Sequence, residues 1–481
     1  MHDIIIIGAG IVGSSIAYNL AKYDLKILVL EKDCEVANGV TKANSAIIHA
    51  GNDPKPQTLK ARLNVLGNQL IEKQCQELHV DFKRVGGLTV AFTPEQVNQL
   101  YSLYERGKEN GVEVYILSKE ELLEREKNLS DSVLLGLYTP STGILAPWDL
   151  VYAQLECAIL NGVEVMTNQL VQSIERKEQG FRVNTTNSTF EGRYIINAAG
   201  LYAEQITRLV TNQMNYQMLP TRGQYYVLDR DVKDYVKHVI YPTGSEKGKG
   251  VLVTPTIHGN ILLGPTADYI TDLEGTETSK EGFSEIKLHM NQMMRNVPYH
   301  AIIKTFSGVR PKTNQKDFII EELKYVPHFI QVAGIESPGL TCAPAIAAYV
   351  ENILLKRERF ILNPNYKVYP QNNVKISELD REEINQLIKI NPLYGRIICR
   401  CEQITEGEIV DAINRPLGAH TIDGIKRRVR PGSGRCQGGF CQPLVQKILA
   451  RELKLDMKDV ILNQENSHIL LEKTKNSGGD R

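Results

Sequence analysis

The sequence has no excess of charge of either sign. It contains 56 lysine and arginine residues against 56 aspartate and glutamate residues. Composition therefore gives no reason to expect nucleic acid or an anionic membrane surface as the partner. Small-molecule chemistry is the better first hypothesis.

Long apolar runs are also missing. None approaches the roughly 20 consecutive apolar residues that a helix needs to cross a bilayer. The chain passes from Met1 into the apolar run Ile4–Ile7 without the basic stretch or cleavage pattern of a secretion signal. We expect a cytoplasmic protein with no transmembrane segment, which a partner could hold at a membrane.

Cysteine is scarce, and no internal repeat is evident. Eight cysteines in 481 residues are too few for a disulfide framework. Four of them nevertheless lie in one short stretch near the C-terminus, and that clustering requires a chemical reason. The scattered remainder are expected to be ordinary core or surface residues, namely Cys34, Cys75, Cys157 and Cys342.

A glycine-rich turn stands near the start of the chain. Gly8–Gly13 lies between a predicted strand, Ile4–Ile7, and a predicted helix, Ser14–Ala21, and a second strand follows at Ile27–Leu30. In this βαβ context the glycines permit a tight turn, a close approach to a pyrophosphate and packing of the helix on the strand. The helix N-terminus then stabilises the anion. The predicted nucleotide contacts are Gly8, Gly10, Ile11, Val12, Gly13, Glu31 and Lys32, with Glu31 on the ribose hydroxyls.

Two later segments resemble the D-amino-acid-oxidase-like flavoproteins. Ile195–Gly200 is similar to the strand and turn that return to the adenosine end of FAD in that superfamily, and Gly334–Leu340 with Ala343-Pro344 is similar to its C-terminal flavin motif. The resemblance implies FAD as the cofactor and a helix starting at Ser337–Leu340 whose dipole stabilises the reduced flavin. The further contacts implied are Ala199, Gly200, Gly334, Ser337, Pro338, Gly339 and Leu340.

The segment from Thr41 to Gly51 resembles the one that passes beneath the flavin ring in glycerol-3-phosphate and 2-hydroxyglutarate dehydrogenases. This implies Thr41, Asn44 and Ser45 as flavin contacts and His49 as the candidate base. Oxidation of an alcohol requires removal of the hydroxyl proton, and a histidine titrating near neutrality suits that step.

Ser307–Pro311 resembles the segment of the same dehydrogenases whose arginine binds the anionic group of the substrate. A guanidinium fits a carboxylate or a phosphate bidentately, so Arg310 is the predicted anchor. The sequence Asn52–Pro56 departs from the anaerobic glycerol-3-phosphate dehydrogenase pattern, which often has an arginine there. Weaker candidates for the substrate site and its wall are Lys60, Tyr241 and Thr254, followed by Arg62, Arg222 and Tyr225.

The four clustered cysteines form two pairs, Cys399/Cys401 and Cys436/Cys441, separated by 34 residues. Four thiolates suit either structural zinc or a [2Fe-2S] cluster. A Cys-x-Cys pair is uncommon among zinc spacings. The pattern resembles the bacterioferritin-associated-ferredoxin-like [2Fe-2S] domain, which implies these four cysteines as the ligands. The nearby basic run Lys426–Arg430 is either a solvated face or an aid to cluster binding or partner docking.

These resemblances together imply an anaerobic glycerol-3-phosphate dehydrogenase-like flavoprotein. The expected reaction is oxidation of sn-glycerol 3-phosphate to dihydroxyacetone phosphate, with electrons passing through the cluster to a second flavoprotein or a quinone-linked subunit. The alternatives are a dehydrogenase of a 2-hydroxy acid such as L-2-hydroxyglutarate, or of a secondary amine or opine. A non-catalytic redox sensor or cluster-delivery protein is a further alternative.

We expect an α/β protein with a Rossmann-type FAD-binding domain, a mixed β-sheet substrate domain and a small helical [2Fe-2S] domain. The FAD-dependent oxidoreductase should cover residues 1–360. Its FAD-binding part is predicted at about 1–80, 145–215 and 305–360, and its substrate part at about 81–144 and 216–304. The remainder is divided into a linker at 361–386, the cluster domain at 387–455 and a tail at 456–481.

Overall fold

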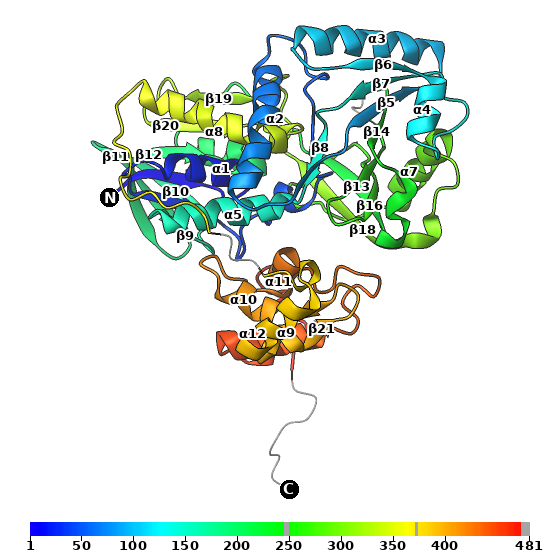
Figure 1. Cartoon of the computed structure of the whole chain (residues 1–481). Helices are drawn as coiled ribbons and strands as arrows, with labels where there is room; N and C mark the ends of the chain where they lie inside the picture. Colours follow the sequence, from blue (N-terminus) through cyan, green and yellow to red (C-terminus); the bar gives the residue numbers. More distant parts are fainter. Residues whose placement is uncertain (245–249, 371–373, 473–481) are drawn as a thin grey trace. The chain divides into compact units, whose positions relative to one another are not determined.

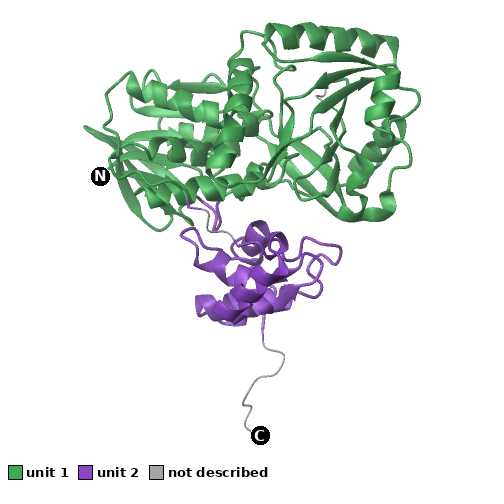
Figure 2. Ribbon diagram, viewed as in Figure 1, with its two compact units in different colours: residues 1–30, 37–369 green, residues 31–36, 370–481 purple. Residues whose placement is uncertain are grey.

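The chain divides into two compact units, which Figure 2 shows in different colours. The computed structural model describes residues 1–244, 250–370 and 374–472. The first unit comprises residues 1–30 and 37–369, and the second comprises residues 31–36 and 370–481. Both contain helices and strands, so the predicted α/β class is confirmed. Among the described residues, no helix is both long and apolar enough to cross a membrane.

The first sheet of the first unit is built around β1 (His2–Ile7) (Figure 1). β1 pairs in parallel with β2 (Ile27–Leu30) on one side and with β12 (Thr189–Asn197) on the other. Its residues Ile4, Ile5 and Ile6 are fully buried, as expected for a strand covered on both faces. In the described part of the chain this sheet has eight strands; the others are β9 (Glu164–Met166), β10 (Val171–Lys177), β11 (Gly180–Thr185), β19 (Ile319–Glu322) and β20 (Phe329–Ala333).

Four helices of the first unit pack on one another and bring distant segments together. α1 (Ile11–Leu20) contacts α5 (Pro147–Leu160) and α8 (Gly339–Leu355), and α8 also contacts α2 (Leu59–Glu77). The α2 and α8 backbones approach closely, because a Cβ atom at Gly67 would lie 2.1 Å from the carbonyl oxygen of Thr341. This crossing holds the middle of α2 beside the first turn of α8.

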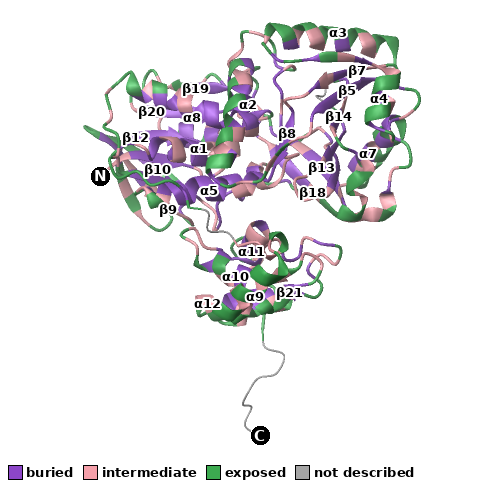
Figure 3. Ribbon diagram, in the orientation of Figure 1, coloured by how far each residue is buried: buried purple, intermediate pink, exposed green. Residues whose placement is uncertain are grey.

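The second sheet of the first unit is mixed, with β13 (Thr221–Leu228) and β18 (Ile302–Arg310) as its longest antiparallel pair. Among the described residues it has nine strands, the others being β5 (Gly87–Ala91), β6 (Tyr115–Ser118), β7 (Leu135–Thr139), β14 (Val239–Pro242), β15 (Leu252–Pro255), β16 (Ile261–Gly264) and β17 (Asp268–Tyr269). Figure 3 shows that its strands are largely buried, whereas α3 (Pro94–Glu109) carries an exposed face.

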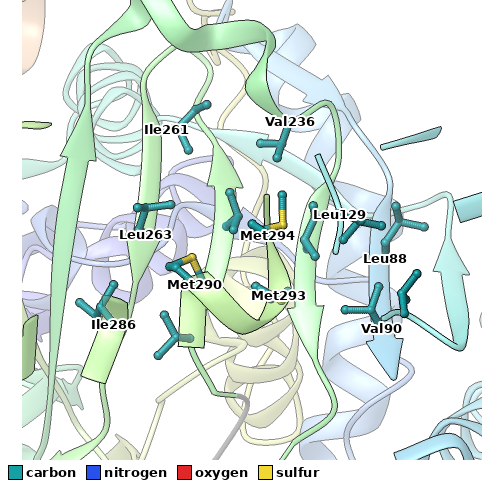
Figure 4. Close-up of a cluster of buried hydrophobic side chains, with 14 of the residues drawn as sticks. Leu88, Val90, Leu129, Val236, Ile261, Leu263, Ile286, Met290, Met293 and Met294 are labelled. Carbon is teal, nitrogen blue, oxygen red and sulfur yellow. The ribbon is translucent and has the colours of Figure 1, made fainter. Parts of the chain in front are cut away.

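The two faces of this second sheet have different neighbours. One face forms an apolar core with α7 (Lys280–Met293), including Leu88, Leu263 and Met290 (Figure 4). On the other face, Val239 and Leu252 pack with Ile47 and Ile144. Ile47 lies in β3 (Ile47–Ile48) and Ile144 in β8 (Gly143–Leu145), and these two strands form a small sheet with β4 (Phe82–Arg84). The second face is therefore turned toward the segment that contains His49.

The second unit is mainly helical. It contains α9 (Arg381–Ile390), β21 (Ile397–Cys399), β22 (Ile404–Thr405), α10 (Glu406–Asn414), α11 (Ile422–Val429) and α12 (Gln442–Leu453). Its apolar core includes Ile409, Ile425 and Leu449, all fully buried. Residues 31–36 belong to this unit: the Glu35 carboxylate, buried, forms an ion pair with the buried Arg428 guanidinium at 3.1 Å.

Several predicted boundaries differ from the observed elements. β18 runs from Ile302 to Arg310 across the predicted boundary at 304/305, because its hydrogen bonds join it to β13 along its whole length. α9 begins at Arg381, inside the predicted linker 361–386, since Asp380 and Glu383 form a capping box there. Of the predicted tail, residues 473–481 lie outside the described residues. Two further α-helices of the first unit are α4 (Lys119–Arg125) and α6 (Ala203–Arg208).

Candidate functional site

The turn after β1 requires glycine at two positions. Gly8 has φ +105°, and a Cβ atom there would lie 2.5 Å from the carbonyl oxygen of Ala198. A Cβ atom at Gly13 would lie 1.9 Å from the carbonyl oxygen of Gly8. The turn and α1 therefore pack as closely as the nucleotide-binding interpretation demands.

The start of α1 offers backbone N–H groups to an anion. Gly10 occupies the N-cap position and has no side chain with which to cap the helix. The N–H of Ile11 donates to the buried Thr41 hydroxyl at 3.0 Å. The N–H groups of Val12 and Gly13 lie in the same first turn, where the helix dipole stabilises negative charge. These residues fit a dinucleotide pyrophosphate.

The turn after β12 lies against the one after β1. Ile7 and Asn197 are partners in the parallel pairing, so Ala199 and Gly200 follow at the same edge of the sheet as Gly8. The Asn197 side chain shapes this turn, because its oxygen accepts from the Ala199 N–H and its amide donates to the Ala203 carbonyl. Gly200 has φ +58°, in the left-handed region that glycine favours.

Glu31 and Lys32 directly follow β2, as predicted. The Glu31 carboxylate accepts a hydrogen bond from the Asp33 N–H at 3.0 Å, and the Lys32 ammonium pairs with the Asp33 carboxylate at 2.8 Å. Their contact with a nucleotide stays a prediction.

The second predicted flavin motif leads into α8. Gly334 has φ +68°, and Pro338 stands at the N-cap of the helix, where it cannot donate or accept through its side chain. Gly339 and Leu340 form the first turn, so the predicted helix start is observed. The Lys60 ammonium lies 2.9 Å from the Glu336 carboxylate, which places Lys60 next to this motif.

His49 is held at a junction of several segments. Its N–H donates to the Thr341 hydroxyl at 2.9 Å, and its carbonyl accepts from the Asn64 and Asn68 amides at 2.9 and 3.0 Å. Its Nε2 lies 3.2 Å from the Ser337 hydroxyl, and its Nδ1 lies 3.4 Å from the Tyr241 hydroxyl. Contacts at both ring nitrogens thus fix the orientation of the His49 ring next to the start of α8.

The Tyr241 hydroxyl stays protonated at neutral pH. Burial, followed by the nearby Asp53 charge, raises the pKa of Tyr241 well above its ordinary value of 10. It is therefore a neutral hydrogen-bonding partner for His49.

Thr254 is predicted, like Tyr241, for the wall of the substrate site. The pairing of Ile240 with Val253 places Thr254 on the same sheet face as Tyr241. Its hydroxyl is buried and has no hydrogen-bond partner among the described residues.

Arg310 ends β18 on the sheet face that meets the segment Thr41–Gly51. Its guanidinium donates to the Thr266 carbonyl at 3.2 and 3.3 Å and passes over Gly223, where a Cβ atom would lie 2.4 Å from Nη2. On the same face, a Cβ atom at Gly308 would lie 2.0 Å from the Ala43 carbonyl oxygen. Also on this face, the Tyr225 hydroxyl lies 3.2 Å from that of Ser45.

Arg222 does not join Arg310, which corrects its prediction as a wall residue. Arg222 pairs with Val309 in the β13/β18 register, so strand alternation turns it to the opposite face. Its guanidinium forms an ion pair with Glu277 instead.

The thiols of the second unit approach one another two by two. The Cys401 and Cys436 sulphurs lie 3.7 Å apart, and the Cys441 thiol donates to the Cys399 sulphur. That hydrogen bond lowers the pKa of Cys399 to about 6. A Cβ atom at Gly434 would lie 2.4 Å from the Cβ of Cys401, so glycine permits the two cysteine loops to meet.

This pairing fits a two-iron centre. Each iron of a [2Fe-2S] cluster takes two of the four cysteines, and the structure supplies two such pairs.

Comparison with known proteins identifies both halves of this arrangement. The model of the FAD dependent oxidoreductase family matches residues 3–353. The chain belongs to this family. A BFD-like [2Fe-2S] binding domain matches residues 397–451, which contain all four cysteines. The protein is thus an FAD-dependent oxidoreductase whose cofactors are FAD and a [2Fe-2S] cluster, as predicted.

Three relatives are informative. A glycerol 3-phosphate dehydrogenase from Caloramator mitchellensis is 48% identical over 99% of both chains. A glycerol 3-phosphate oxidase from Mycoplasma genitalium is 34% identical over 76% of this oxidoreductase and 98% of its own length. The FAD-bound structure of L-alpha-glycerophosphate oxidase from Mycoplasma pneumoniae has a TM-score of 0.73 at 31% identity, covering 77% of this chain and 98% of its own.

Sequence reasoning missed the residues that hold His49. Asn64 and Asn68 are one helical turn apart on α2, a spacing that puts two amides on one face. That signal was present, but only the crossing of α2 with α8 shows that both amides reach His49. Thr341 lies between Leu340 and Ala343-Pro344 of the predicted flavin motif and gave no signal of its own.

Proposed function

We propose that this oxidoreductase converts sn-glycerol 3-phosphate to dihydroxyacetone phosphate and passes the electrons through its [2Fe-2S] cluster to a partner protein. When bound, FAD supplies the hydride acceptor and the cluster supplies one-electron transfer. The substrate assignment is supported by the relative named glycerol 3-phosphate dehydrogenase, which aligns with 99% of the chain.

The aligned length of each relative supports a protein, and not oxygen, as the electron acceptor. The relative named as an oxidase aligns with 76% of the chain while using 98% of its own length, so it has no counterpart to about a quarter of this protein. The relative named as a dehydrogenase spans the cysteine module as well. An enzyme that reduces oxygen directly needs no cluster, whereas one that reduces a protein can use it.

His49 is proposed as the base that removes the proton of the substrate C2 hydroxyl. Nε2 would receive this proton if Nδ1 carries the ring proton and donates it to the Tyr241 hydroxyl, 3.4 Å away. Ser337, 3.2 Å from Nε2, sits beside the start of α8 and marks where the substrate hydroxyl would approach. The His49 N–H donates to the Thr341 hydroxyl, and the His49 carbonyl accepts from the Asn64 and Asn68 amides, so the backbone of His49 is fixed before substrate arrives.

Arg310 is proposed to bind the phosphate. Its guanidinium donates to the neutral Thr266 carbonyl, and in the described part of the chain it forms no ion pair with a carboxylate. Its charge is therefore available to a dianionic group. A guanidinium binds phosphate through two parallel hydrogen bonds, which would orient the C2 carbon relative to His49.

The test is anaerobic reduction of the flavin in the purified full-length protein. Glycerol 3-phosphate should bleach the flavin absorbance, whereas L-2-hydroxyglutarate, an amino acid such as sarcosine and an opine should not. Bleaching by one of these compounds but not by glycerol 3-phosphate would refute the substrate. If no small hydroxy or amino compound reduces the flavin, the enzymatic role fails and a redox-sensing role replaces it.

A further inference from the structure

The four cysteines of the cluster module differ sharply in exposure. Cys399 and Cys441 are 1% and 2% exposed and belong to the apolar core of the module. Cys401 and Cys436, whose sulphurs lie 3.7 Å apart, are only half-buried. The centre they would hold therefore has one side in the protein core and one side near solvent.

Two exposed apolar residues lie next to the cysteines in the chain. Phe440, directly before Cys441, is 85% exposed, and Ile397, two residues before Cys399, is 58% exposed. A phenyl ring left in water costs hydrophobic free energy, and exposed aromatic residues are enriched where proteins bind one another. Nothing in the folding of the module requires this ring at the surface, since its core is made by other residues.

The charges around the loops are mostly positive. Arg400 lies between Cys399 and Cys401 and Arg435 precedes Cys436, and both are exposed. The acidic residue of these loops, Glu402, has a side chain only 6% exposed and is paired with Arg430 at 3.1 Å. A partner approaching Cys401 and Cys436 thus meets arginine side chains and an aromatic ring.

We propose that Phe440, Arg400 and Arg435 form the docking surface for an acidic redox protein, which receives electrons on the Cys401/Cys436 side of the module. The inference rests on the proposed transfer of electrons to a partner and specifies its surface. Attraction between opposite charges speeds the encounter of the two proteins and weakens as salt rises. The apolar contact of Phe440 then holds the short-lived complex together. Only electrons cross this surface, one for each acceptor molecule reduced.

The test uses two acceptors that share one haem but differ in charge. Cytochrome c has a basic surface, and its lysine-succinylated form has an acidic one. Full-length enzyme carrying FAD and cluster is reduced anaerobically with dithionite and mixed with each acceptor at low salt. We expect the acidic form to be reduced at least about tenfold faster, with a rate that falls as salt rises. Equal rates, or a faster basic acceptor, would overturn the proposal.

Variants locate the surface. Arg400→Glu combined with Arg435→Glu should slow the acidic acceptor about tenfold and speed the basic one. The matched control, Lys454→Glu with Lys458→Glu, changes the net charge equally but lies beyond the far end of α12, and should leave the preference for the acidic acceptor in place. If the control pair alters both rates as much as the arginine pair, the charge of the whole protein is responsible and the surface assignment fails.

Binding gives a readout independent of turnover. Phe440→Ala should weaken the affinity of the oxidised enzyme for oxidised succinylated cytochrome c roughly fivefold. Visible circular dichroism and electron paramagnetic resonance of each variant must match the parent, which ensures that the cluster is intact. Unchanged affinity with an intact cluster would overturn the role of Phe440. Flavin bleaching by glycerol 3-phosphate without acceptor, measured on the same variants, tests the proposed function separately.

Discussion

The proposed proton-accepting site of the first unit and the cysteine module of the second are built in different ways. His49 is fixed by hydrogen bonds with residues of α2 and α8 and is flanked by Tyr241 and Ser337. The most distant of these partners, Thr341, is 292 positions away in the chain. The four cysteines come from two short loops, 399–401 and 436–441. Proton removal needs an oriented group held by many segments, whereas electron transfer needs ligands and a surface that a partner can reach.

The largest effect is expected at His49. His49→Asn should slow flavin reduction by glycerol 3-phosphate roughly 10²- to 10⁴-fold, the usual loss of a general base. Reduction by dithionite and the cluster spectra should not change, because the module is built independently of this residue. Anaerobic stopped-flow absorbance measures both rates. A loss of less than tenfold would mean that another group accepts the proton.

The second prediction concerns the buried ion pair of the second unit. Glu35→Gln leaves the Arg428 charge without its partner and should destabilise the module by about 3–5 kcal/mol. Glu452→Gln, which removes one carboxylate from an exposed pair with Arg451, should cost about 1 kcal/mol or less. Thermal loss of cluster absorbance reports on the module. Equal shifts for the two variants would show that burial does not strengthen the Glu35 pair.

The same pair sets a pH dependence. Burial alone would raise the pKa of Glu35, but the Arg428 and Arg427 charges and the His420 N–H outweigh it and lower that pKa below 4.5. A depressed carboxyl pKa stabilises the folded state above the unfolded pKa, and this contribution is lost as pH falls toward the folded pKa. Cluster absorbance should therefore be lost on acidification below about pH 4.5, and Glu35→Gln should flatten that dependence.

Arg310 should have a smaller effect than His49. Arg310→Met would remove the proposed charged hydrogen bonds to the phosphate and should lower kcat/KM roughly 10- to 100-fold. Arg310→Lys should recover part of this loss because it keeps the charge without the planar fork. Arg222→Met is the matched control, since Arg222 is on the opposite face of the same strand pair, and it should change kcat/KM about twofold or less. A larger effect of Arg222→Met would contradict the assigned faces.

The difference between the two regions explains what the sequence could predict. The Gly8–Gly13 turn and the cysteine spacing are local patterns whose physics is complete within a few residues, so they predicted a dinucleotide site and a metal centre. The resemblances to known families then implied FAD and a [2Fe-2S] cluster. The family matches confirm those cofactors. The roles of individual site residues stay predictions, although the structure brings His49, Tyr241 and Ser337 together.

Other features depend on tertiary packing and left no readable local pattern. Arg222 was predicted as a weaker candidate for the same site as Arg310, but the β13/β18 register turns the two side chains to opposite faces. The reach of Asn64 and Asn68 to His49 depends on the close α2/α8 crossing at Gly67. The placement of residues 31–36 in the second unit depends on the long-range pair between Glu35 and Arg428.

The smallest predicted effect tests whether the two units are independent. Thr405 caps α10 in the second unit, where its hydroxyl accepts from the Glu408 N–H at 3.3 Å, and Thr93 caps α3 in the first unit in the same way from the Gln96 N–H. Replacing either threonine by alanine should lower the free energy of unfolding of its unit by about 1 kcal/mol.

If the units unfold separately, Thr405→Ala should lower only the temperature at which cluster absorbance is lost. Thr93→Ala should lower only the temperature at which flavin fluorescence appears. Thermal scans that follow both signals in one sample compare them directly. If each variant shifts both signals together, the chain unfolds as one cooperative body. The two units then have no separate free energies of unfolding.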